Sequence, residues 1–397
     1  MIDPQPLYAR LRAEDPVHYM EQYDTWALAS FSAVWQALSD TDSFSVRRGQ
    51  TPLQILLGEP AANLTFPELD SPEHRFRRRV FTPHYTREVA QHEAVTIRTI
   101  ARSVLDARLH AHDDLDAFED YAHVVAGRFA ASKAGIPLDD ADELRRNISA
   151  AFRREPGQRG TSEANQVAMI AVFGYLQSLV AECRFDRAKA AGMLATLLEA
   201  SVNGEPLSDA QVASELHTLM VTGSDTTELA VAGTLYYLAR HPDQRAEVLA
   251  DPAQCAWAFA ETLRYDHPTD ILGRCVQRDV EVGGKALRAG QGVLLLWGSA
   301  NRDEAEFPDA DRYDIHRRYA RSLVFGQGQH KCIGEHIGMR MGTVMLEVLL
   351  SSISMFEVDF DRVERRCGEF LKGYNKVPIS VATRSRSRRS NSFAAES

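Results

Sequence analysis

One cysteine stands in a glycine-rich stretch at 325–334, which reads FGQGQHKCIG. Glycine permits backbone angles that other residues resist, and it lets a backbone approach a ligand closely. The run after Cys332 has a helical pattern, and the positive end of such a helix would favour a thiolate over a thiol. No second cysteine lies nearby, which excludes a zinc knuckle built on paired cysteines. The stretch suits a ligand that needs one strong axial donor, and haem iron is the leading case. The alternative is a structural cysteine buried in a glycine-rich turn.

The pattern Phe-x-x-Gly-x-His-x-Cys-x-Gly resembles the haem-binding signature of the cytochrome P450 family. It is carried by Phe325, Gly328, His330, Cys332 and Gly334. The resemblance implies a mainly α fold with a smaller β-region, in which a triangular prism of helices surrounds a buried haem. It also implies haem b as cofactor, Cys332 as the axial ligand of the iron, and His330 as a partner of a haem propionate.

Composition narrows the function classes. The net charge of −10 argues against a nucleic-acid partner. The five cysteines are scattered and odd in number, so no disulfide framework is predicted, which fits a reducing cytoplasm. The opening MIDPQP lacks the basic and apolar regions of a signal peptide, and no apolar stretch near 20 residues is evident. We therefore expect a cytoplasmic protein without a membrane anchor, similar to the bacterial-type branch of the family, and a monomer.

The resemblance covers about 20–380, with motifs in the family order. It predicts a single P450 domain over 1–383. The tail at 384–397 is basic and serine-rich, a composition typical of disorder.

The N-terminal part predicts short strands within 17–30, a helix through Val34 and Leu38, and an irregular loop over 45–70. A long loop with apolar residues of its own is usually functional. In the family this loop covers the distal face of the haem and contacts substrate. A surface loop with a small apolar cluster is the equally weighted alternative.

The segment 70–79 predicts a helix with Ser71 as N-cap and Pro72 at the first position. His74 and Arg78 are four residues apart, so they share one helix face and can clamp an anionic group. By resemblance that group is a haem propionate. Taken alone, the pair would be read as part of an exposed basic face.

A long helix is predicted from a capping box at Ser208 and Gln211 to Arg240. Its middle, 222–227, is a run of six poor helix formers, TGSDTT. These residues do not stabilise a helix of this length. A local departure from helix propensity tends to mark a functional site. A kink without chemistry is the alternative.

Within that run, Gly223 leaves room beside the helix for a flat or diatomic ligand. Thr226 has a hydroxyl that donates and accepts, and Asp225 can relay protons from bulk water. The run resembles the family motif in which an acid and a threonine deliver protons to iron-bound dioxygen. Asp225 and Thr226 are thus the predicted catalytic residues. Thr222 departs from the usual alanine or glycine, and its extra atoms either crowd the oxygen site or join its hydrogen bonds.

Three further motifs belong to the scaffold and the cofactor. Glu261 and Arg264 form an i,i+3 pair that would ordinarily lie on a surface. By resemblance the pair is buried and joined by Arg317 in a folding role. Arg274 matches the strand arginine that binds a propionate in the family.

The candidate substrate contacts are Phe66, Thr222, Asp270, Ile271 and Tyr374. Asp270 is unusual, since an acid stands in a segment that faces substrate in the family. We expect it to turn to solvent; the alternative is that it orients a polar or cationic substrate group.

The resemblance implies a haem-thiolate monooxygenase that inserts one atom of O2 into a hydrophobic small molecule. No flavin or iron–sulfur motif is present in the sequence, so electrons are expected from a separate ferredoxin and its reductase. Lys331, Arg340 and the arginines within 75–79 are the hypothetical docking face. A peroxide-driven P450 and a haem-thiolate sensor or ligand carrier are the rival functions. Terpenoid, steroid, fatty acyl and aromatic substrates all stay open.

Overall fold

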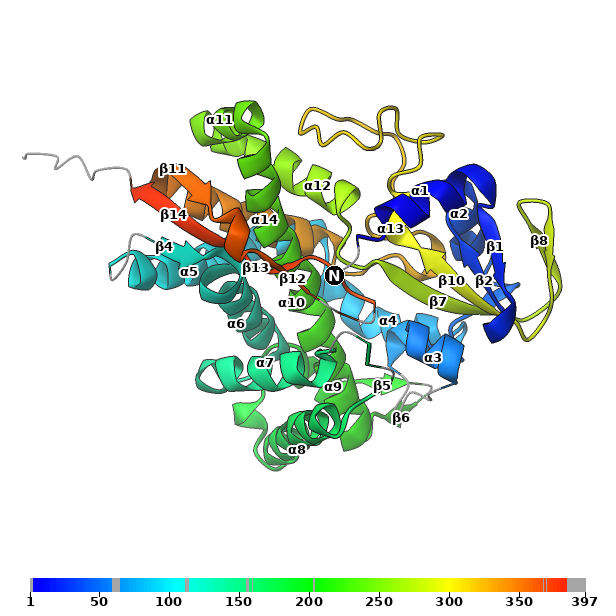
Figure 1. Cartoon of the computed structure of the whole chain (residues 1–397). Helices are drawn as coiled ribbons and strands as arrows, with labels where there is room; N and C mark the ends of the chain where they lie inside the picture. Colours follow the sequence, from blue (N-terminus) through cyan, green and yellow to red (C-terminus); the bar gives the residue numbers. More distant parts are fainter. Residues whose placement is uncertain are drawn as a thin grey trace, which may run out of the picture.

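The computed structural model describes residues 3–58, 65–110, 114–154, 157–158, 160–202, 204–366, 368 and 370–383. Helices dominate, and the largest sheet lies to one side of them (Figure 1). This arrangement agrees with the predicted fold class. The predicted tail at 384–397 lies outside the described residues.

The chain alternates helices with short strands throughout. The α-helices are α1 (Gln5–Glu14), α2 (Phe31–Ser39), α3 (Pro52–Leu57), α4 (Glu73–Phe81), α5 (Arg87–Leu109), α6 (His123–Ala134), α7 (Leu138–Phe152), α8 (Glu163–Phe185), α9 (Gly192–Glu199), α10 (Asp209–Arg240), α11 (Pro242–Ala250), α12 (Cys255–Tyr265), α13 (Trp297–Ala300) and α14 (Glu335–Ser352). A π-helix, η4 (Ala117–Ala122), leads into α6, and short 3-10 turns include η2 (Phe66–Glu68), η7 (Gly328–His330) and η8 (Phe360–Arg362).

The strands are β1 (Val17–Met20), β2 (Thr25–Leu28), β3 (Phe44–Ser45), β4 (Asp114–Asp116), β5 (Ser201–Val202), β6 (Glu205–Pro206), β7 (Ile271–Val276), β8 (Val280–Val282), β9 (Lys285–Leu287), β10 (Gly292–Leu296), β11 (Ile353–Val358), β12 (Glu364–Arg365), β13 (Tyr374–Lys376) and β14 (Pro378–Thr383). The main sheet has the order β1-β2-β10-β7-β3. Its one parallel pair, β10 with β2, places Val293 opposite Trp26. The antiparallel pair β10 with β7 places Val293 opposite Arg274, so the sheet fixes where that arginine lies.

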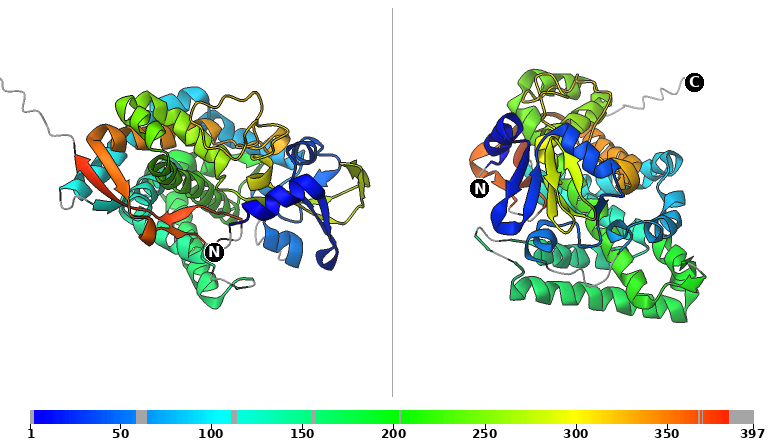
Figure 2. Two further views of the ribbon diagram at one scale, coloured as in Figure 1. Left: turned by 45° about the horizontal axis from the view of Figure 1, so that its top comes forward. Right: turned by 90° about the vertical axis from the view of Figure 1, so that its right-hand side faces the viewer.

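Helix α10 runs through the middle of the molecule in every view (Figures 1 and 2). It is a continuous helix with the predicted capping box, in which Ser208 accepts from the N–H of Gln211. The poor helix formers do not break it, and Thr222 and Ser224 donate their hydroxyls to the carbonyls of Thr218 and Met220 within the helix. Most of its residues are buried, and α6, α8, α12 and α14 pack around it. Tertiary packing therefore outweighs local propensity here.

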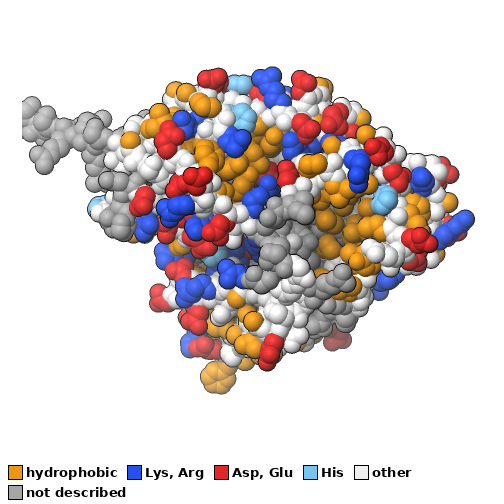
Figure 3. Space-filling model, viewed as in Figure 1, with side chains coloured by type: hydrophobic (Ala, Val, Ile, Leu, Met, Phe, Trp, Pro, Cys, Tyr) orange, Lys and Arg blue, Asp and Glu red, His pale blue; other side chains and the backbone are white. Residues whose placement is uncertain are grey.

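The five-stranded sheet and its flanking helices lie on one side of α10, whereas α5 to α8 and the sheet β11-β14-β4 lie on the other (Figure 1). Two large apolar cores join these helices to α10. One contains Ile97, Phe118 and Met345, and the other contains Ile148, Leu176 and Leu216. On the face shown in Figure 3, acidic and basic side chains are interspersed rather than separated by sign.

Three local predictions need correction. The segment 45–70 is not wholly irregular, because Thr51 and Gln54 form a capping box that starts α3. Ser71 does not cap α4: the helix begins at Glu73 after Pro72, and the Ser71 hydroxyl donates to Gln329 instead. The prediction that no apolar stretch near 20 residues exists also needs correction. Helix α8 is long and apolar enough by composition to cross a membrane, although a helix packed within a globular fold passes the same test.

The scaffold motif comes together in the interior. Arg264 binds Glu261 through two nitrogens, at 2.7 and 2.9 Å, and donates to the carbonyls of Asn301 and Ala310. Arg317 reaches the same carboxylate at 3.3 Å. Arg264 is fully buried, so this pair is not the ordinary surface pair that its spacing suggests. It ties α12 to the segment that leads to the cysteine loop.

Candidate active site

The cysteine loop is closed by a backbone hydrogen bond from Cys332 N–H to Phe325 O, at 2.8 Å. Gly326 and Gly328 both adopt φ near +70°, the left-handed region that other residues resist. At Gly328 a Cβ would lie 2.4 Å from the carbonyl oxygen of Leu38. The close approach of the loop to α2 therefore requires glycine there.

Cys332 lies just before α14, whose N-cap is Gly334. Its side chain is accessible to a water-sized probe, yet burial among protein atoms raises the pKa of the thiol, opposed by the Gly334 N–H and by Arg78. The two observations agree if the sulfur borders an interior space rather than bulk solvent. A sulfur in that setting can bind a ligand that the protein encloses.

Four basic side chains converge beside this loop: His74 and Arg78 from α4, Arg274 from β7, and His330 from η7. We call them the basic cradle. The rings of His74 and His330 lie 4.4 Å apart between centroids. Both nitrogens of His74 and the Nδ1 of His330 are buried without a hydrogen-bond partner among the described residues. Arg78 donates to the carbonyl of Lys331 at 2.7 Å.

The pKa values in the basic cradle show how poorly its charges are compensated. Burial, followed by repulsion from Arg274, His74 and Arg78, lowers the pKa of His330 to about 2. Burial lowers the pKa of His74 to about 4 and that of Arg274 to about 10. Asp70 acts in the opposite direction on both, but its carboxylate is already bound by Ser45, Val46 and Arg47.

His74 and His330 are neutral at physiological pH, so the charge of the cradle lies on Arg78 and Arg274. Buried cations of this kind need an anionic partner. Haem has two propionate carboxylates on one edge of a flat ring, and the residues present fit it. The unpartnered histidine nitrogens, together with Arg78 and Arg274, would bind the carboxylates. The sulfur of Cys332 would face the iron. A hollow of about 400 Å³ adjoins the cradle and is lined by Ser71, His74, Arg75, Arg78, Arg79, Thr82 and Gln329, without a carboxylate.

The middle of α10 presents two different faces. Thr222 and Gly223 are accessible and Thr226 is half-buried, whereas Asp225 is buried. Thr222 and Thr226 are four residues apart, which places them on the same side of the helix. A Cβ at Gly223 would meet only Ala130, at an ordinary 3.7 Å, so the space beside this position is open.

Asp225 belongs to a buried cluster that we call the acid network. It comprises Asp225 and Glu228 of α10, Arg145 of α7, His123 of α6, and Arg366. The Nη2 of Arg145 donates to both carboxylates, at 2.5 Å to Glu228, while its Nε and Nη1 are buried without a partner in the described part of the chain. Arg366 lies 3.8 Å from Asp225, and His123 lies 3.2 Å from Glu228.

The pKa values of the two carboxyl groups of the acid network are shifted in opposite directions. Burial raises the pKa of Asp225, and Arg145 and Arg366 offset this only in part. Burial also acts to raise the pKa of Glu228, but Arg145 and His123 outweigh it and the pKa is lowered. Asp225 was predicted to relay protons from bulk water; in the structure it lies buried and bound to Arg145, and its role in the relay stays a prediction. The sequence analysis missed Arg145, Glu228, His123 and Arg366, although Glu228 follows Asp225 at i+3 on the same helix face.

The candidate substrate contacts divide into two groups. Phe66 stacks on Phe81 at 4.6 Å, lies 6.3 Å from the His74 ring, and donates its backbone N–H to Glu215. It therefore adjoins the basic cradle. Ile271 starts β7 and packs partly against a small apolar cluster of the β-region. Thr222 is accessible in the middle of α10.

The expectation that Asp270 turns to solvent is wrong, and Tyr374 lies in the core. Asp270 does not turn to solvent: it accepts a hydrogen bond from the Tyr8 hydroxyl at 2.7 Å and pairs with Lys372 at 2.9 Å, which also occupies its carboxylate. Tyr374 is buried in the core and stacks on Tyr236, with ring centroids 4.1 Å apart. Aromatic packing with the C-terminal half of α10 accounts for its position, and its contact with substrate stays a prediction.

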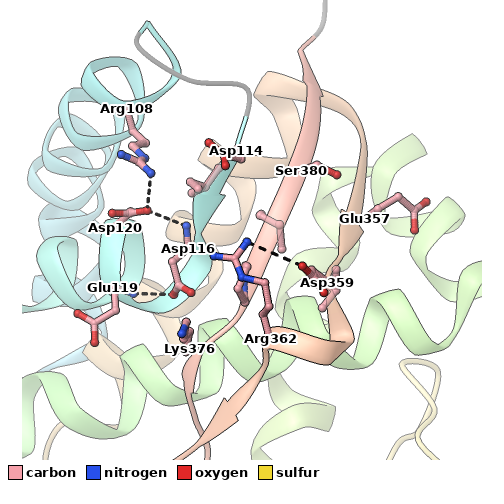
Figure 4. Close-up of a pocket in the computed structure, with 14 residues that line it drawn as sticks. Arg108, Asp114, Asp116, Glu119, Asp120, Glu357, Asp359, Arg362, Lys376 and Ser380 are labelled. Atoms are coloured by element: carbon pink, nitrogen blue, oxygen red, sulfur yellow. Dashed lines mark hydrogen bonds and ion pairs between the residues drawn. The ribbon is translucent and has the colours of Figure 1, made fainter.

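A hollow of about 520 Å³ lies elsewhere, between α5, η4, β11 and β14 (Figure 4). Its lining is rich in carboxylates, including Asp114, Glu119 and Asp359. None of the predicted site residues lines it. Its acids are engaged in part by Arg108 and Arg362. Size therefore does not identify the site; the accessible sulfur and the uncompensated basic cradle do.

A fold of this kind, with one accessible cysteine sulfur beside a basic cradle, fits a haem-binding protein. The family model for cytochrome P450 matches residues 161–253 and 255–373. The protein named cytochrome P450 123 of Mycobacterium tuberculosis is 33% identical over 388 residues, covering 96% of this chain and 95% of its own. The monooxygenase PikC of Streptomyces venezuelae is 31% identical, covering 95% of this chain and 91% of its own.

Among solved structures, CYP108D1 of Novosphingobium aromaticivorans superposes with a TM-score of 0.84 at 26% identity, covering 96% of this chain and 95% of its own. This chain belongs to the cytochrome P450 family and is a P450 monooxygenase, an oxidoreductase. Membership implies a haem cofactor, O2, redox partners and a small-molecule substrate.

Proposed function

We propose that this enzyme binds haem b through Cys332 and inserts one atom of O2 into a hydrophobic small molecule, with electrons from a separate ferredoxin and its reductase. The observation that carries the proposal is the basic cradle beside an accessible cysteine sulfur. It supports a ligand with two carboxylates and a metal that takes a thiolate. When bound, the haem supplies oxygen activation, which the electron-rich thiolate promotes.

In this proposal the cradle orients the cofactor. His74, Arg78, Arg274 and His330 bind the propionates, while Phe325, Gly328 and Gly334 shape the loop that presents Cys332. Gly223 leaves space beside α10 for the small oxygen ligand. Glu261, Arg264 and Arg317 hold the scaffold behind the loop.

Proton supply is assigned to Thr226 and Asp225. Thr226 lies on the accessible side of α10, and its hydroxyl can pass on a proton while accepting another. The raised pKa of Asp225 makes its carboxyl group able to hold a proton, provided that it leaves Arg145. Glu228 also binds Arg145, so the arginine keeps one partner when Asp225 moves.

Electrons would enter from the side of the cysteine loop. Arg75 and Arg79 are exposed there, and Lys331 is exposed although paired with Glu335 at 2.6 Å. Together with Arg340 they form the proposed docking face for an acidic ferredoxin. Reversal of charge at Arg75 and Arg79 should slow reduction of the iron by ferredoxin, with an effect that fades as salt is raised. Unchanged reduction rates would overturn this docking face.

The proposal also retains a cytoplasmic monomer that binds no nucleic acid. The relatives are bacterial proteins, and the acidic net charge is consistent with this. Sedimentation of the holoenzyme over a range of concentrations tests the oligomeric state.

The main experiment compares the wild type with Cys332→Ser and Thr226→Ala. Cys332→Ser should lose the red-shifted carbon monoxide spectrum that thiolate-bound haem gives, and should lose turnover. Thr226→Ala should keep that spectrum and continue to consume O2, but should release more of it as peroxide and less as product. A wild-type-like spectrum in Cys332→Ser would overturn the assignment of the ligand.

The same assays separate the rival functions. A peroxide-driven P450 would turn over with hydrogen peroxide alone and gain nothing from a ferredoxin pair. A sensor or carrier would bind haem and ligand without substrate-dependent O2 consumption, and Thr226→Ala would change nothing.

A further inference from the structure

The acid network reaches the protein surface at a histidine. His123, the first residue of α6, has 15% of its side chain exposed, whereas the side chains of Asp225 and Glu228 are 4% and 0% exposed. Arg145 and Arg366 also belong to the network, but an arginine keeps its protons in proteins. His123 is therefore the member of the network that can both reach solvent and exchange a proton with it.

Hydrogen bonds connect this histidine to the middle of α10. The Nδ1 of His123 lies 3.2 Å from one oxygen of Glu228, and the other oxygen accepts from Arg145 Nη2 at 2.5 Å. The same nitrogen donates to Asp225. Glu228 and Asp225 are three residues apart on α10, so their side chains are neighbours on the helix surface. The two carboxyl groups thus lie between His123 and Thr226, the residue that follows Asp225.

The remaining donors of Arg145 indicate a place for a small proton carrier. Its Nε and Nη1 are buried without a partner in the described part of the chain. Buried donors that no side chain satisfies are commonly bound by an ordered water molecule. A water molecule held by Arg145 would lie beside both carboxyl groups and could carry a proton from Glu228 to Asp225.

The pKa shifts of the two carboxyl groups give this path a direction. Burial acts to raise the pKa of Glu228, but Arg145 and His123 outweigh it and the pKa is lowered. Burial raises the pKa of Asp225. A proton that arrives at Glu228 is therefore released readily and is held better at Asp225. Arg145 keeps a partner throughout, because it donates to both groups and one of them is ionised at each stage.

Carboxyl groups from three elements interact with His123: Glu228 of α10, Glu119 of η4 and Asp142 of α7. Asp142 is also bound by Arg128 at 2.7 Å. Glu119 lines the hollow shown in Figure 4, which is rich in carboxylates. This end of the network therefore lies towards a surface of negative potential, which concentrates cations and protons near it.

We infer that His123 is a proton-relay residue that supplies Asp225 through Glu228. The protonated imidazole gives its Nδ1 proton to the Glu228 carboxylate, which passes a proton through water to the Asp225 carboxylate. Asp225 then gives a proton to the Thr226 hydroxyl, which releases its own towards the oxygen site. The neutral imidazole takes the next proton from solvent, so every group returns to its starting state and no electron moves along the network. The inference rests on the proposed function and adds the source of its protons.

Hydrogen exchange at the Asp225 carboxyl group tests the relay without turnover. Infrared spectroscopy of the holoenzyme follows the shift of the protonated carboxyl band after transfer into D2O, and Asp225→Asn identifies the band. His123→Asn places an amide nitrogen near the position of Nδ1, so it keeps a donor to Glu228 but cannot pass a proton on. Exchange should slow at least about tenfold, short of the roughly 100-fold typical of a group that transfers a proton directly, because solvent still reaches Glu228 during fluctuations.

Two further variants separate a relay from a structural role. His123→Gly should exchange as slowly as His123→Asn, and added imidazole should restore most of the rate. The double variant of His123→Asn and Glu228→Gln should exchange no more slowly than His123→Asn alone, because both substitutions interrupt one path. The control is His241→Asn, at a half-buried histidine whose Nδ1 binds the carbonyl of Tyr237, and it should exchange like the wild type.

Haem content and circular dichroism show whether each variant is folded. Wild-type exchange in His123→Asn would overturn the inference, and so would slow exchange in His123→Gly that imidazole leaves unchanged. Both results are compatible with a protein that keeps the thiolate spectrum and loses product in Thr226→Ala, so they differ from failure of the proposed function. A Thr226→Ala variant with the wild-type ratio of product to O2 consumed would instead overturn the proposed function itself.

Discussion

The basic cradle and the acid network are both buried clusters of charge, but only one of them is balanced by the protein. The cradle brings together His74, Arg78, Arg274 and His330, and the nearby carboxylate, Asp70, is bound elsewhere. In the acid network two carboxylates face Arg145, with Arg366 and His123 beside them. An unbalanced cluster is stable only with a ligand of opposite charge, whereas a balanced cluster is part of the folded protein.

The comparison separates two uses of buried charge in one enzyme. The cradle holds two buried arginines without a carboxylate of their own, a cost that an anionic cofactor relieves, so cofactor binding and folding are linked. In the network, Arg145 donates to both Asp225 and Glu228. The proton chemistry of Asp225 therefore depends on whether Arg145 binds both carboxyl groups or Glu228 alone. Removing an arginine should therefore have opposite consequences in the two places.

The largest effect is expected for Arg145→Met. The substitution leaves Asp225 and Glu228 buried without their shared donor, and breaking a buried pair in this way costs about 3–5 kcal/mol. Urea unfolding of the holoenzyme measures the free energy of unfolding. The control is Arg128→Met, which removes an arginine from a half-exposed pair with Asp142 and should cost less than about 1 kcal/mol. Equal losses in the two variants would show that Arg145 is not a structural counter-ion.

A second effect concerns pH. Glu215 of α10 is buried, accepts from Arg77 at 3.0 Å and from Phe66 N–H, and burial raises its pKa from 4.5 to about 7. The folded state therefore binds more protons than the unfolded state between these values. Its contribution to stability is complete below about pH 4.5 and is lost as pH rises through 7, to a total of about 3 kcal/mol.

Glu215→Gln should remove that dependence. The free energy of unfolding of the wild type should fall relative to the variant between pH 5 and pH 8, because only the wild type has a carboxyl group to ionise there. Asp209→Asn changes a half-exposed acid on the same helix and should leave the profile parallel to that of the wild type. If the wild type and Glu215→Gln also gave parallel profiles, the raised pKa of Glu215 would be wrong.

The third prediction concerns the stability of the haem-free protein, which Arg274→Met should not lower as Arg145→Met lowers the stability of the holoenzyme. Arg274→Met removes a buried cation that has no carboxylate bound to it, so the haem-free protein should be no less stable than the wild type. The holoenzyme should lose a charge-assisted hydrogen bond to a propionate, about 1.5–3 kcal/mol, or about 10- to 100-fold in haem affinity. Transfer of haem to an excess of apomyoglobin measures the loss. A haem-free variant that unfolds more easily would contradict the comparison.

Particular residues show why part of this site could be predicted and part could not. The cysteine loop, the long helix and the buried pair of Glu261 and Arg264 follow local spacing, which the sequence displays directly. Arg145 and Arg366 contact Asp225 across 80 and more positions of the chain, and pair by tertiary packing that no local pattern encodes. Asp270 has the same explanation, since its partner Tyr8 comes from the first helix.

The smallest effect is expected at Thr222, where the sequence departs from its family. Its Oγ1 donates to the carbonyl of Thr218 at 2.7 Å, so the hydroxyl proton already has an acceptor. Thr222→Ala should therefore stabilise α10 by about 0.5 kcal/mol, the difference in helix propensity. It should also leave the ratio of product to O2 consumed unchanged. Thr226→Ala, the same substitution one turn along the same face, should lower that ratio. A lowered ratio in Thr222→Ala alone would move the proton path to Thr222 and away from the acid network.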